Sequence, residues 1–383
     1  MLPIENLTIH RLRGLRDVEL TGCGRVNVLV GRNNSGKTTV LEAVAFHARP
    51  LSPAEWLEAV SRRDPALSRS AIIEGLRWLF PQAKEEDVAE ARPESRMVHI
   101  SGQGSLPTRE ARTHFEEIEG YLLGGDESPS GDATEFSPLG EGVLRHGARL
   151  RFHATLTAND AAPSSSGPAP SHEERFAVDF WEARPSLISL PQQTGATPIA
   201  TVTPFSHRIR QLEVEALSDA VFSDLKPTVL DLLKQFDPDI EDLEILKRPR
   251  NDAAIYLRHR RLGRAPLSTF GDGMRRVLLM GVSLATVQGG ILLVDEIESA
   301  IHTRALDASF RWLIQACQRL DVQLFATTHS LEAVDALLAA STSSSDDLVV
   351  YRLESKDGNT RAKRFSQDQL TVLREELGQE IRV

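Results

Sequence analysis

Cysteine is nearly absent from this sequence, in which Cys23 and Cys317 are the only two among 383 residues. Two cysteines provide neither a disulfide framework nor a four-ligand zinc set. The first residues, MLPIENLTIHRLRG, also lack the long apolar stretch of a secretory signal. We therefore expect a protein of the reducing cytoplasm.

Long hydrophobic runs are also missing. The longest uncharged run, Val277–Val294, contains Gln288, Gly289 and Gly290 in its second half. This pattern indicates a buried helix, a turn and a strand instead of a membrane span. With 41% hydrophobic and 26% charged residues, the composition is that of a globular protein with no expected membrane contact.

An excess of positive charge is lacking too, because the formal net charge is −10. This balance argues against a globally basic nucleic-acid binder. Positive charge is nevertheless concentrated between residues 247 and 264. A solvated hairpin face and a local contact with DNA phosphates are both compatible with such a cluster. Its members are Lys247, Arg248, Arg250, Arg258, Arg260, Arg261 and Arg264.

The stretch VNVLVGRNNSGKTT, residues 26–39, predicts a nucleotide site. A short β-branched run is followed by a complete G-x-x-x-x-G-K-[ST] loop and then by a segment of helical character. Glycines let backbone N–H groups close around phosphate oxygens, and the helix N-terminus adds partial positive charge. Lys37 is expected to reach the β- and γ-phosphates, and Thr38 to ligate Mg²⁺. The predicted ATP-binding residues are Gly31, Arg32, Asn33, Asn34, Ser35, Gly36, Lys37, Thr38 and Thr39.

Two further apolar runs end in polar side chains that suit the same chemistry. ILLV at 291–294 precedes Asp295 and Glu296, and VQLFATT at 322–328 precedes His329. Parallel strands deliver such residues to one edge of an open α/β sheet. Asp295 is expected to serve Mg²⁺, and Glu296 to position or activate the attacking water.

The rest of the pattern predicts three segments. Residues 1–50 and 196–383 form two parts of an ATPase lobe, and residues 51–195 form an insertion with a low-complexity tip at 159–171. In the insertion we expect helices from Leu51 to about Gln82 and over Thr108–Leu123, where apolar residues recur at helical spacing. Strands are expected at 97–100, 149–157 and 175–182, and outside the insertion at 4–9, 16–20, 243–246 and 253–258.

Four motifs together resemble the ABC-type ATPase heads of the SMC, RecF and OLD group. They are GRNNSGKTT, PLSTFGDGMRR at 266–276, GGILLVDEIESAIH at 289–302 and FATTHS at 325–330. The resemblance is closest to compact stand-alone ATPases of bacterial defence and repair loci. It implies an α/β P-loop NTPase of ABC type, with a mixed sheet core, an antiparallel β subdomain and a helical insertion.

The same resemblance implies residue roles. Lys37, Glu296 and His329 would be catalytic, with His329 contacting the γ-phosphate. Gly271, Asp272, Gly273 and Arg275 would belong to the signature that contacts the nucleotide of a second subunit. Gly271 stands where the family usually has serine, unless the register is one residue longer and Ser268 takes that place. The stretch Glu298–His302 would cross the dimer interface, and no Q-loop glutamine is identifiable, although Gln192 and Gln193 lie near the expected region.

These roles favour an ATP- and Mg²⁺-dependent ATPase that acts as a switch or motor in a homodimer or larger even oligomer. A DNA-linked process, above all anti-phage defence with a separately encoded effector, is the expected setting. The alternatives are a RecF- or SMC-type repair ATPase that acts directly on DNA, and an OLD-like nuclease component. After His329, 54 of the 383 residues remain, which is short for an ordinary nuclease domain. Glycine, proline and serine tracts in the insertion disfavour a long SMC-like coiled coil.

Overall fold

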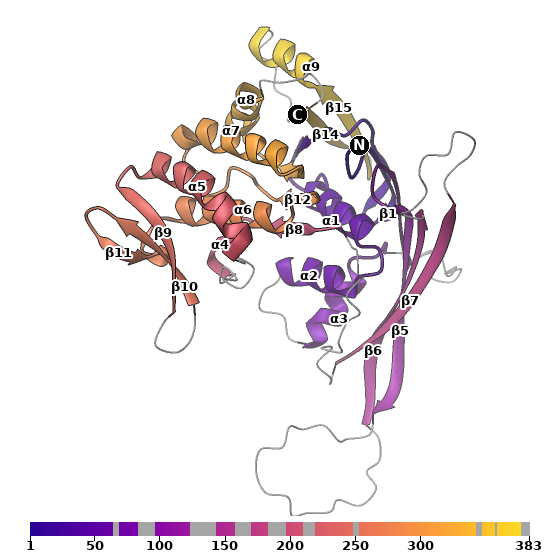
Figure 1. Cartoon of the computed structure of the whole chain (residues 1–383). Coiled ribbons are helices and arrows are strands. Elements are labelled where there is room, and N and C mark those ends of the chain that lie inside the picture. Colours follow the sequence, from indigo (N-terminus) through magenta and orange to yellow (C-terminus); the bar gives the residue numbers. More distant parts are fainter. Residues whose placement is uncertain are drawn as a thin grey trace, which may run out of the picture.

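A parallel sheet covered by helices and a second, antiparallel sheet organise the molecule (Figure 1). The computed structural model describes residues 1–63, 69–82, 96–122, 143–157, 170–182, 197–209, 219–247, 253–341, 347–356 and 358–376. None of the described helices is long and apolar enough to span a membrane.

The strands are β1 (Asn6–Leu12), β2 (Leu15–Leu20), β3 (Val26–Gly31), β4 (Met97–Gln103), β5 (Thr108–Leu122), β6 (Val143–Thr157), β7 (Ser171–Trp181), β8 (Ile199–Val202), β9 (Ile240–Lys247), β10 (Ala253–His259), β11 (Gly263–Pro266), β12 (Ile291–Val294), β13 (Gln323–Thr327), β14 (Leu348–Lys356) and β15 (Asn359–Ser366). The helices are α1 (Lys37–Ala48), α2 (Pro53–Arg63), α3 (Arg69–Arg77), α4 (Ser206–Ile209), α5 (Asp219–Phe236), α6 (Asp272–Thr286), α7 (Thr303–Arg319), α8 (Leu331–Ala340) and α9 (Gln367–Thr371). A 3-10 turn at Leu267–Thr269 precedes α6, and a π-helix at Val372–Glu376 follows α9.

The central sheet has the strand order β15-β14-β3-β13-β12-β8. Neighbours from β14 to β8 are parallel, and β15 pairs with β14 in the antiparallel sense. All residues of β3, β12 and β13 are buried, as expected for continuous apolar runs in a sheet covered on both faces. The carboxyl ends of β3, β13 and β12 therefore meet at one edge, with β13 in the middle.

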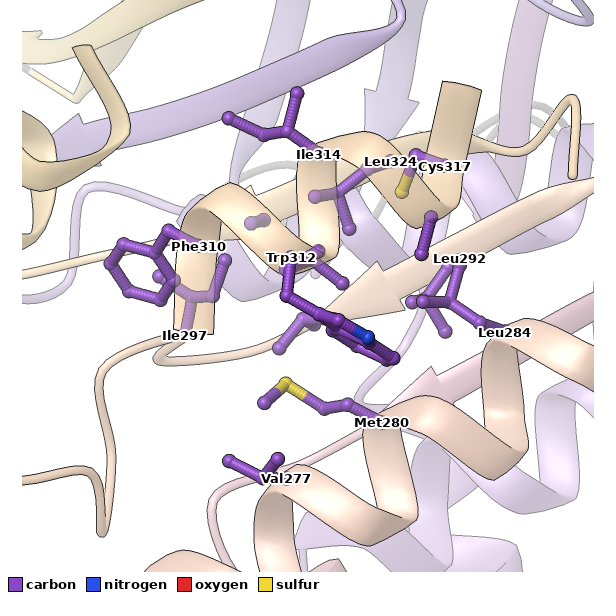
Figure 2. Packing of buried hydrophobic residues seen from close by; sticks show 14 of the residues in the cluster. Val277, Met280, Leu284, Leu292, Ile297, Phe310, Trp312, Ile314, Cys317 and Leu324 are labelled. Carbon is purple, nitrogen blue, oxygen red and sulfur yellow. The ribbon is translucent and has the colours of Figure 1, made fainter. Parts of the chain in front are cut away.

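Alternate residues of these strands serve two hydrophobic cores. Leu292 and Leu324 belong to the core built with α5, α6, α7 and α8, whereas Leu293 and Phe325 face the core shared with α1 and the antiparallel sheet. Figure 2 shows the first core, in which Trp312 of α7 lies against α6 next to Met280. This two-sided packing fixes the register of the strands and so the position of the residues that follow them.

The antiparallel sheet has the order β2-β1-β4-β5-β6-β7 and joins the first two strands of the chain to strands of the insertion. The strands predicted at 97–100, 149–157 and 175–182 are confirmed. The helix predicted over Thr108–Leu123 is wrong, because this segment is the strand β5. Ala111, Thr113 and Phe115 are buried in alternation, and this period of two decides the structure there.

The remaining sequence predictions largely agree with the structure. Helices α2 and α3 occupy the predicted helical region, and β1, β2, β9 and β10 occupy the predicted strand positions. A third strand, β11, extends the β9–β10 pair. The tip at 159–171 lies mostly outside the described residues, as do Gln192 and Gln193. The α/β fold with a mixed core sheet, an antiparallel β subdomain and inserted helices is confirmed, and the three segment boundaries stay a prediction.

Candidate active site at the carboxyl edge of the central sheet

The phosphate loop connects β3 to α1 and depends on glycine at both ends. Gly31 has a φ of 146° and Gly36 a φ of 93°, which L side chains rarely adopt. A Cβ at Gly31 would lie 2.6 Å from the Leu353 carbonyl oxygen, and one at Gly36 would lie 2.7 Å from the Leu15 side chain. Strand β14 of the central sheet and the β1–β2 hairpin thus leave no room for a larger residue at Gly31 or Gly36.

The first turn of α1 fits an anionic ligand. Its N-cap is Gly36, which offers no side-chain acceptor, and its first turn contains no acid, so backbone N–H groups are left to a ligand. The Ser35 hydroxyl is buried and has no hydrogen-bond partner among the described residues. Arg32, Asn33 and Asn34 are exposed at the tip of the loop, and Thr39 is buried behind it. These features suit the phosphates of a nucleotide.

Lys37 places its ammonium group inside this loop. Its Nζ donates to the carbonyl oxygens of Gly31 and Arg32, both at 2.9 Å. Burial lowers the pKa of Lys37, and the carboxylates of Asp295, Glu296 and Glu298 oppose this shift. A cation in this position is available to phosphate oxygens, which would exchange the two carbonyl acceptors for charged ones.

Thr38 and Asp295 form an oxygen-rich pair beside the loop. The Thr38 hydroxyl lies 3.1 and 3.2 Å from the two carboxylate oxygens of Asp295, although the residues are 257 positions apart. Hydroxyl and carboxylate oxygens are the ligands that Mg²⁺ prefers. The residues therefore fit the magnesium ion that the sequence predicts.

Thr327, which the sequence reasoning missed, holds both acids in place. Its hydroxyl donates to Asp295 Oδ1 at 2.6 Å and accepts from the backbone N–H of Glu296 at 2.8 Å. Thr327 is buried at the end of β13, between the strands that carry the loop and the acids. The sequence did show a threonine at the end of the apolar run before His329. Its hydrogen-bond partners, Asp295 and Glu296, follow a different strand and could not be inferred from this position.

Glu296 and His329 lie on the turns that follow β12 and β13. Glu296 has a φ of 48°, a left-handed conformation that a non-glycine residue adopts only when neighbouring contacts fix it. Glu298 Oε1 accepts from the backbone N–H of His329 at 2.9 Å and so ties the two turns together. His302, in the predicted interface stretch, caps α7 by accepting from the Arg304 N–H through Nδ1.

The predicted signature lies at the N-terminus of α6. Gly271 is its N-cap, whereas Ser268 belongs to the preceding 3-10 turn. Arg275 donates to the Asp272 side chain and to the His207 carbonyl oxygen. A Cβ at Gly273 would lie 2.6 Å from the Ala300 carbonyl oxygen. The signature thus contacts α4 and the turn after Glu298 in its own subunit, while its N-terminal end carries no capping side chain.

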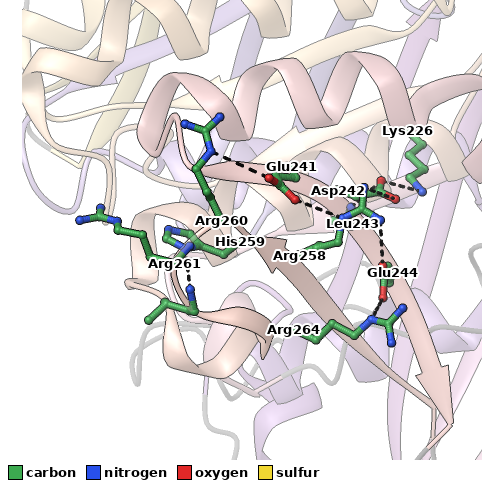
Figure 3. Close-up of polar contacts among 11 residues, drawn as sticks. Lys226, Glu241, Asp242, Leu243, Glu244, Arg258, His259, Arg260, Arg261 and Arg264 are labelled. Carbon is green, nitrogen blue, oxygen red and sulfur yellow. Dashed lines mark hydrogen bonds and ion pairs between the residues drawn. The ribbon is translucent and has the colours of Figure 1, made fainter.

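The basic hairpin pairs its arginines internally. Arg261 lies 2.6 Å from Asp239. Arg264 of β11 lies 2.8 Å from Glu244 of β9, as Figure 3 shows. Arg258 and Arg260 both approach Glu241, at 3.4 and 3.9 Å. Arg248, Arg250 and the Lys247 side chain lie outside what the structure describes. The described part of the cluster is therefore a charge-balanced surface.

The chain is similar to several known proteins. The family model described as "AAA domain, putative AbiEii toxin, Type IV TA system" matches residues 26–335, which is more than half of the chain. An uncharacterized protein of Methanocaldococcus jannaschii is 31% identical over 114 residues, covering 29% of this chain and 98% of that protein. An ATP/GTP phosphatase of Helicobacter pylori is 19% identical over 342 residues, with 87% of each chain covered.

Two solved SMC heads are also similar. An Smc head with an extended coiled coil, bound to the C-terminal domain of ScpA from Pyrococcus furiosus, has a TM-score of 0.49 and 10% identity, covering 99% of this chain and 100% of that one. The SMC head domain from Thermotoga maritima has a TM-score of 0.43 and 12% identity, covering 95% and 99%. From its phosphate loop, its paired acids and the family match, the chain belongs to the AAA domain family described as putative AbiEii toxin and is a P-loop ATPase.

Proposed function

We propose that two copies of this chain close around ATP and reopen after hydrolysis, and that this motion switches a separate effector protein. The observation that carries the proposal is the position of the signature. Arg275 donates to Asp272 and His207, and Gly273 lies against Ala300, so these contacts are with their own part of the chain. We assign the phosphate loop that they would serve to a second copy. A second copy related by a two-fold axis would complete two sites at once.

In this proposal, each site residue has a separate role in hydrolysis. Lys37 and the first turn of α1 bind the β- and γ-phosphates, and Glu296 accepts a proton from the attacking water. Thr38 and Asp295 would hold Mg²⁺, which when bound neutralises phosphate charge. His329 would donate a hydrogen bond to the γ-phosphate. The uncapped N-terminus of the partner's α6 would face that phosphate and exclude water from it.

The effector is proposed to be separately encoded and to act in anti-phage defence. The family description, which names a putative toxin of a toxin–antitoxin system, supports a defence setting.

Mixing two inactive variants tests the shared site. Lys37→Ala removes the phosphate contact, and Gly271→Arg blocks the signature. Gly271 suits this purpose because its added Cβ meets nothing within 4 Å and its φ is −63°, whereas a side chain at Gly273 would strike its own subunit. Randomly paired dimers should regain about a quarter of wild-type ATP hydrolysis, since half are heterodimers with one intact site. No recovery, with heterodimers shown to form, would mean that each chain hydrolyses ATP alone.

A further inference from the structure

Arg276 is a fully buried cation that joins three parts of the active-site edge. It lies on α6, one residue beyond the signature, and its side chain is 0% exposed. Nη1 donates to the Thr203 carbonyl oxygen at 2.7 Å, just after β8. Nη2 donates to the carbonyl oxygens of Asp295 and Glu296, at 2.9 and 2.7 Å. One guanidinium group therefore connects the signature helix to the backbone of the catalytic acids.

Arg276 bonds to the backbone of Glu296, which has a left-handed conformation with a φ of 48°. A left-handed residue other than glycine costs about 1 kcal/mol and persists where surrounding contacts fix it. Here the N–H of Glu296 is fixed by Thr327 on β13, and its carbonyl oxygen is fixed by Arg276 on α6. The direction of the Glu296 side chain thus depends on two elements at once.

Stability alone does not account for this buried charge. Burial lowers the pKa of Arg276 to about 10, and the carboxylates of Glu298, Glu296 and Asp295 oppose the shift, so the group stays charged at neutral pH. Its Nε has no hydrogen-bond partner among the described residues. A buried charge is weak evidence for a stabilising role, because the cost of desolvating it can exceed the gain from its contacts. The three carbonyl contacts instead point to a geometric role.

We infer that Arg276 is a positioning residue that couples the signature of a subunit to the catalytic Glu296 of that same subunit. A displacement of the α6 N-terminus, where the proposed function places the partner's nucleotide, would reach Glu296 through two hydrogen bonds. In the proposed dimer, the partner's nucleotide would thereby influence the rate of hydrolysis without being required for it. The coupling between sites rests on the proposed dimer, whereas the positioning of Glu296 is a property of one chain.

Two substitutions separate positioning from folding. Arg276→Met should lower kcat by about 100-fold, because a misplacement near 1 Å costs that much. Its Kd for ATP should stay within about threefold of wild type, since the phosphate loop does not depend on Arg276. Arg276→Lys should regain part of kcat because it keeps a positive charge and one donor group, although it lacks the guanidinium fork. Met280→Leu, a size-conserving change at a buried position of the same helix, serves as the matched control.

An unchanged kcat in Arg276→Met would overturn the inference. Equal losses of ATP affinity and kcat in both Arg276 variants, with a lowered Tm, would do so as well by showing a merely structural role. Mixing Arg276→Met with Glu296→Gln tests the direction of action. No recovery is expected, because each chain would damage its own site, and recovery would show that Arg276 acts on the partner. The mixture of Lys37→Ala with Gly271→Arg runs in parallel, so failure of the dimer is distinguished from failure of Arg276.

Discussion

Two hydroxyl groups from different elements approach the Asp295 carboxylate. Thr38 approaches from the phosphate loop, and Thr327 approaches from β13. Only Thr327 also bonds to the backbone of Glu296. The two threonines therefore differ in role, because Thr38 is available to a metal ion whereas Thr327 fixes the acids that surround it.

Thr327→Val tests this role with almost no change in shape. The variant leaves the buried N–H of Glu296 without its acceptor, which costs about 1–3 kcal/mol. We expect a similar loss in free energy of unfolding and a fall in kcat of about 10- to 100-fold, measured by denaturant titration and steady-state kinetics. Thr327→Ser keeps the hydroxyl and should stay near wild type. Equal kcat in the valine and wild-type proteins would assign the orientation of the acids to other contacts.

Lys37→Ala tests nucleotide binding itself. Among the residues that the structure describes, the Lys37 ammonium group donates to two carbonyl oxygens, which phosphate oxygens would replace. Its removal should abolish ATP binding in calorimetry, a loss of at least about 100-fold in affinity. Lys234→Ala, on the exposed side of α5, is the matched control and should bind ATP as wild type does. Measurable binding with unchanged affinity in Lys37→Ala would disprove the assignment.

Sequence reasoning predicted the candidate site residues whose spacing along the chain is fixed. Lys37 and Thr38 follow the glycine loop directly, and Asp295 and Glu296 follow a buried strand. Thr327 and Arg276 could not be found in this way, because each acts on backbone groups that only the tertiary structure brings near. Nothing in the local sequence of α6 specifies that Arg276 points to the end of β12.

Helix and strand prediction failed at β5 for an identifiable reason. Phe115, Ile118 and Leu122 are three and four residues apart, which is a helical spacing. Ala111, Thr113 and Phe115 also alternate with polar residues, and pairing with β4 and β6 favours that second pattern. Long antiparallel partners on both sides outweigh a short local preference.

The charge of the basic hairpin is likewise balanced by acids on the neighbouring strand β9. Arg258 and Arg264 of β10 and β11 approach Glu244 of β9, at 3.6 and 2.8 Å. The acids that balance these arginines come from a neighbouring part of the chain that the local charge count did not include. Exposed pairs of this kind contribute little stability, about 0–1 kcal/mol each. Because these arginines are paired with acids, little positive charge is left to bind the phosphate backbone of DNA.

A triple substitution, Arg258→Ala with Arg260→Ala and Arg261→Ala, tests whether the hairpin binds DNA. Because their partners are acids of the same hairpin, we expect the affinity for duplex DNA and its salt dependence to stay as in wild type. Binding would be measured by fluorescence anisotropy at several salt concentrations. A smaller slope of log affinity against log salt in the variant would instead show phosphate contacts at these arginines.

At the scale of the whole molecule, side-chain hydrogen bonds join the first residues of the chain to strands β13 and β14 of the central sheet. The Gln323 side chain bonds to both backbone groups of Ile4, and Tyr351 donates to the Thr21 carbonyl oxygen. Strands from the first residues share the antiparallel sheet with the insertion. The sequence predicted many of the individual strands, although not β5, β11 or β15, and it did not predict their order. Strand pairing over such separations is decided by packing and not by local pattern.

Glu296→Gln should make the proposed assembly visible. The amide cannot accept the proton of the attacking water, so ATP stays intact while Lys37 and the first turn of α1 still bind it. With its γ-phosphate retained, the nucleotide would keep two copies closed. We expect a dimer with ATP and a smaller species with ADP, measured by light scattering after size exclusion.

Adding Gly271→Arg to the same chain should return the ATP-bound protein to the smaller species, because the blocked signature cannot reach the partner's phosphate. If Glu296→Gln has the same mass with ATP, with ADP and without nucleotide, ATP does not control assembly, and the switch would have to operate within a fixed oligomer.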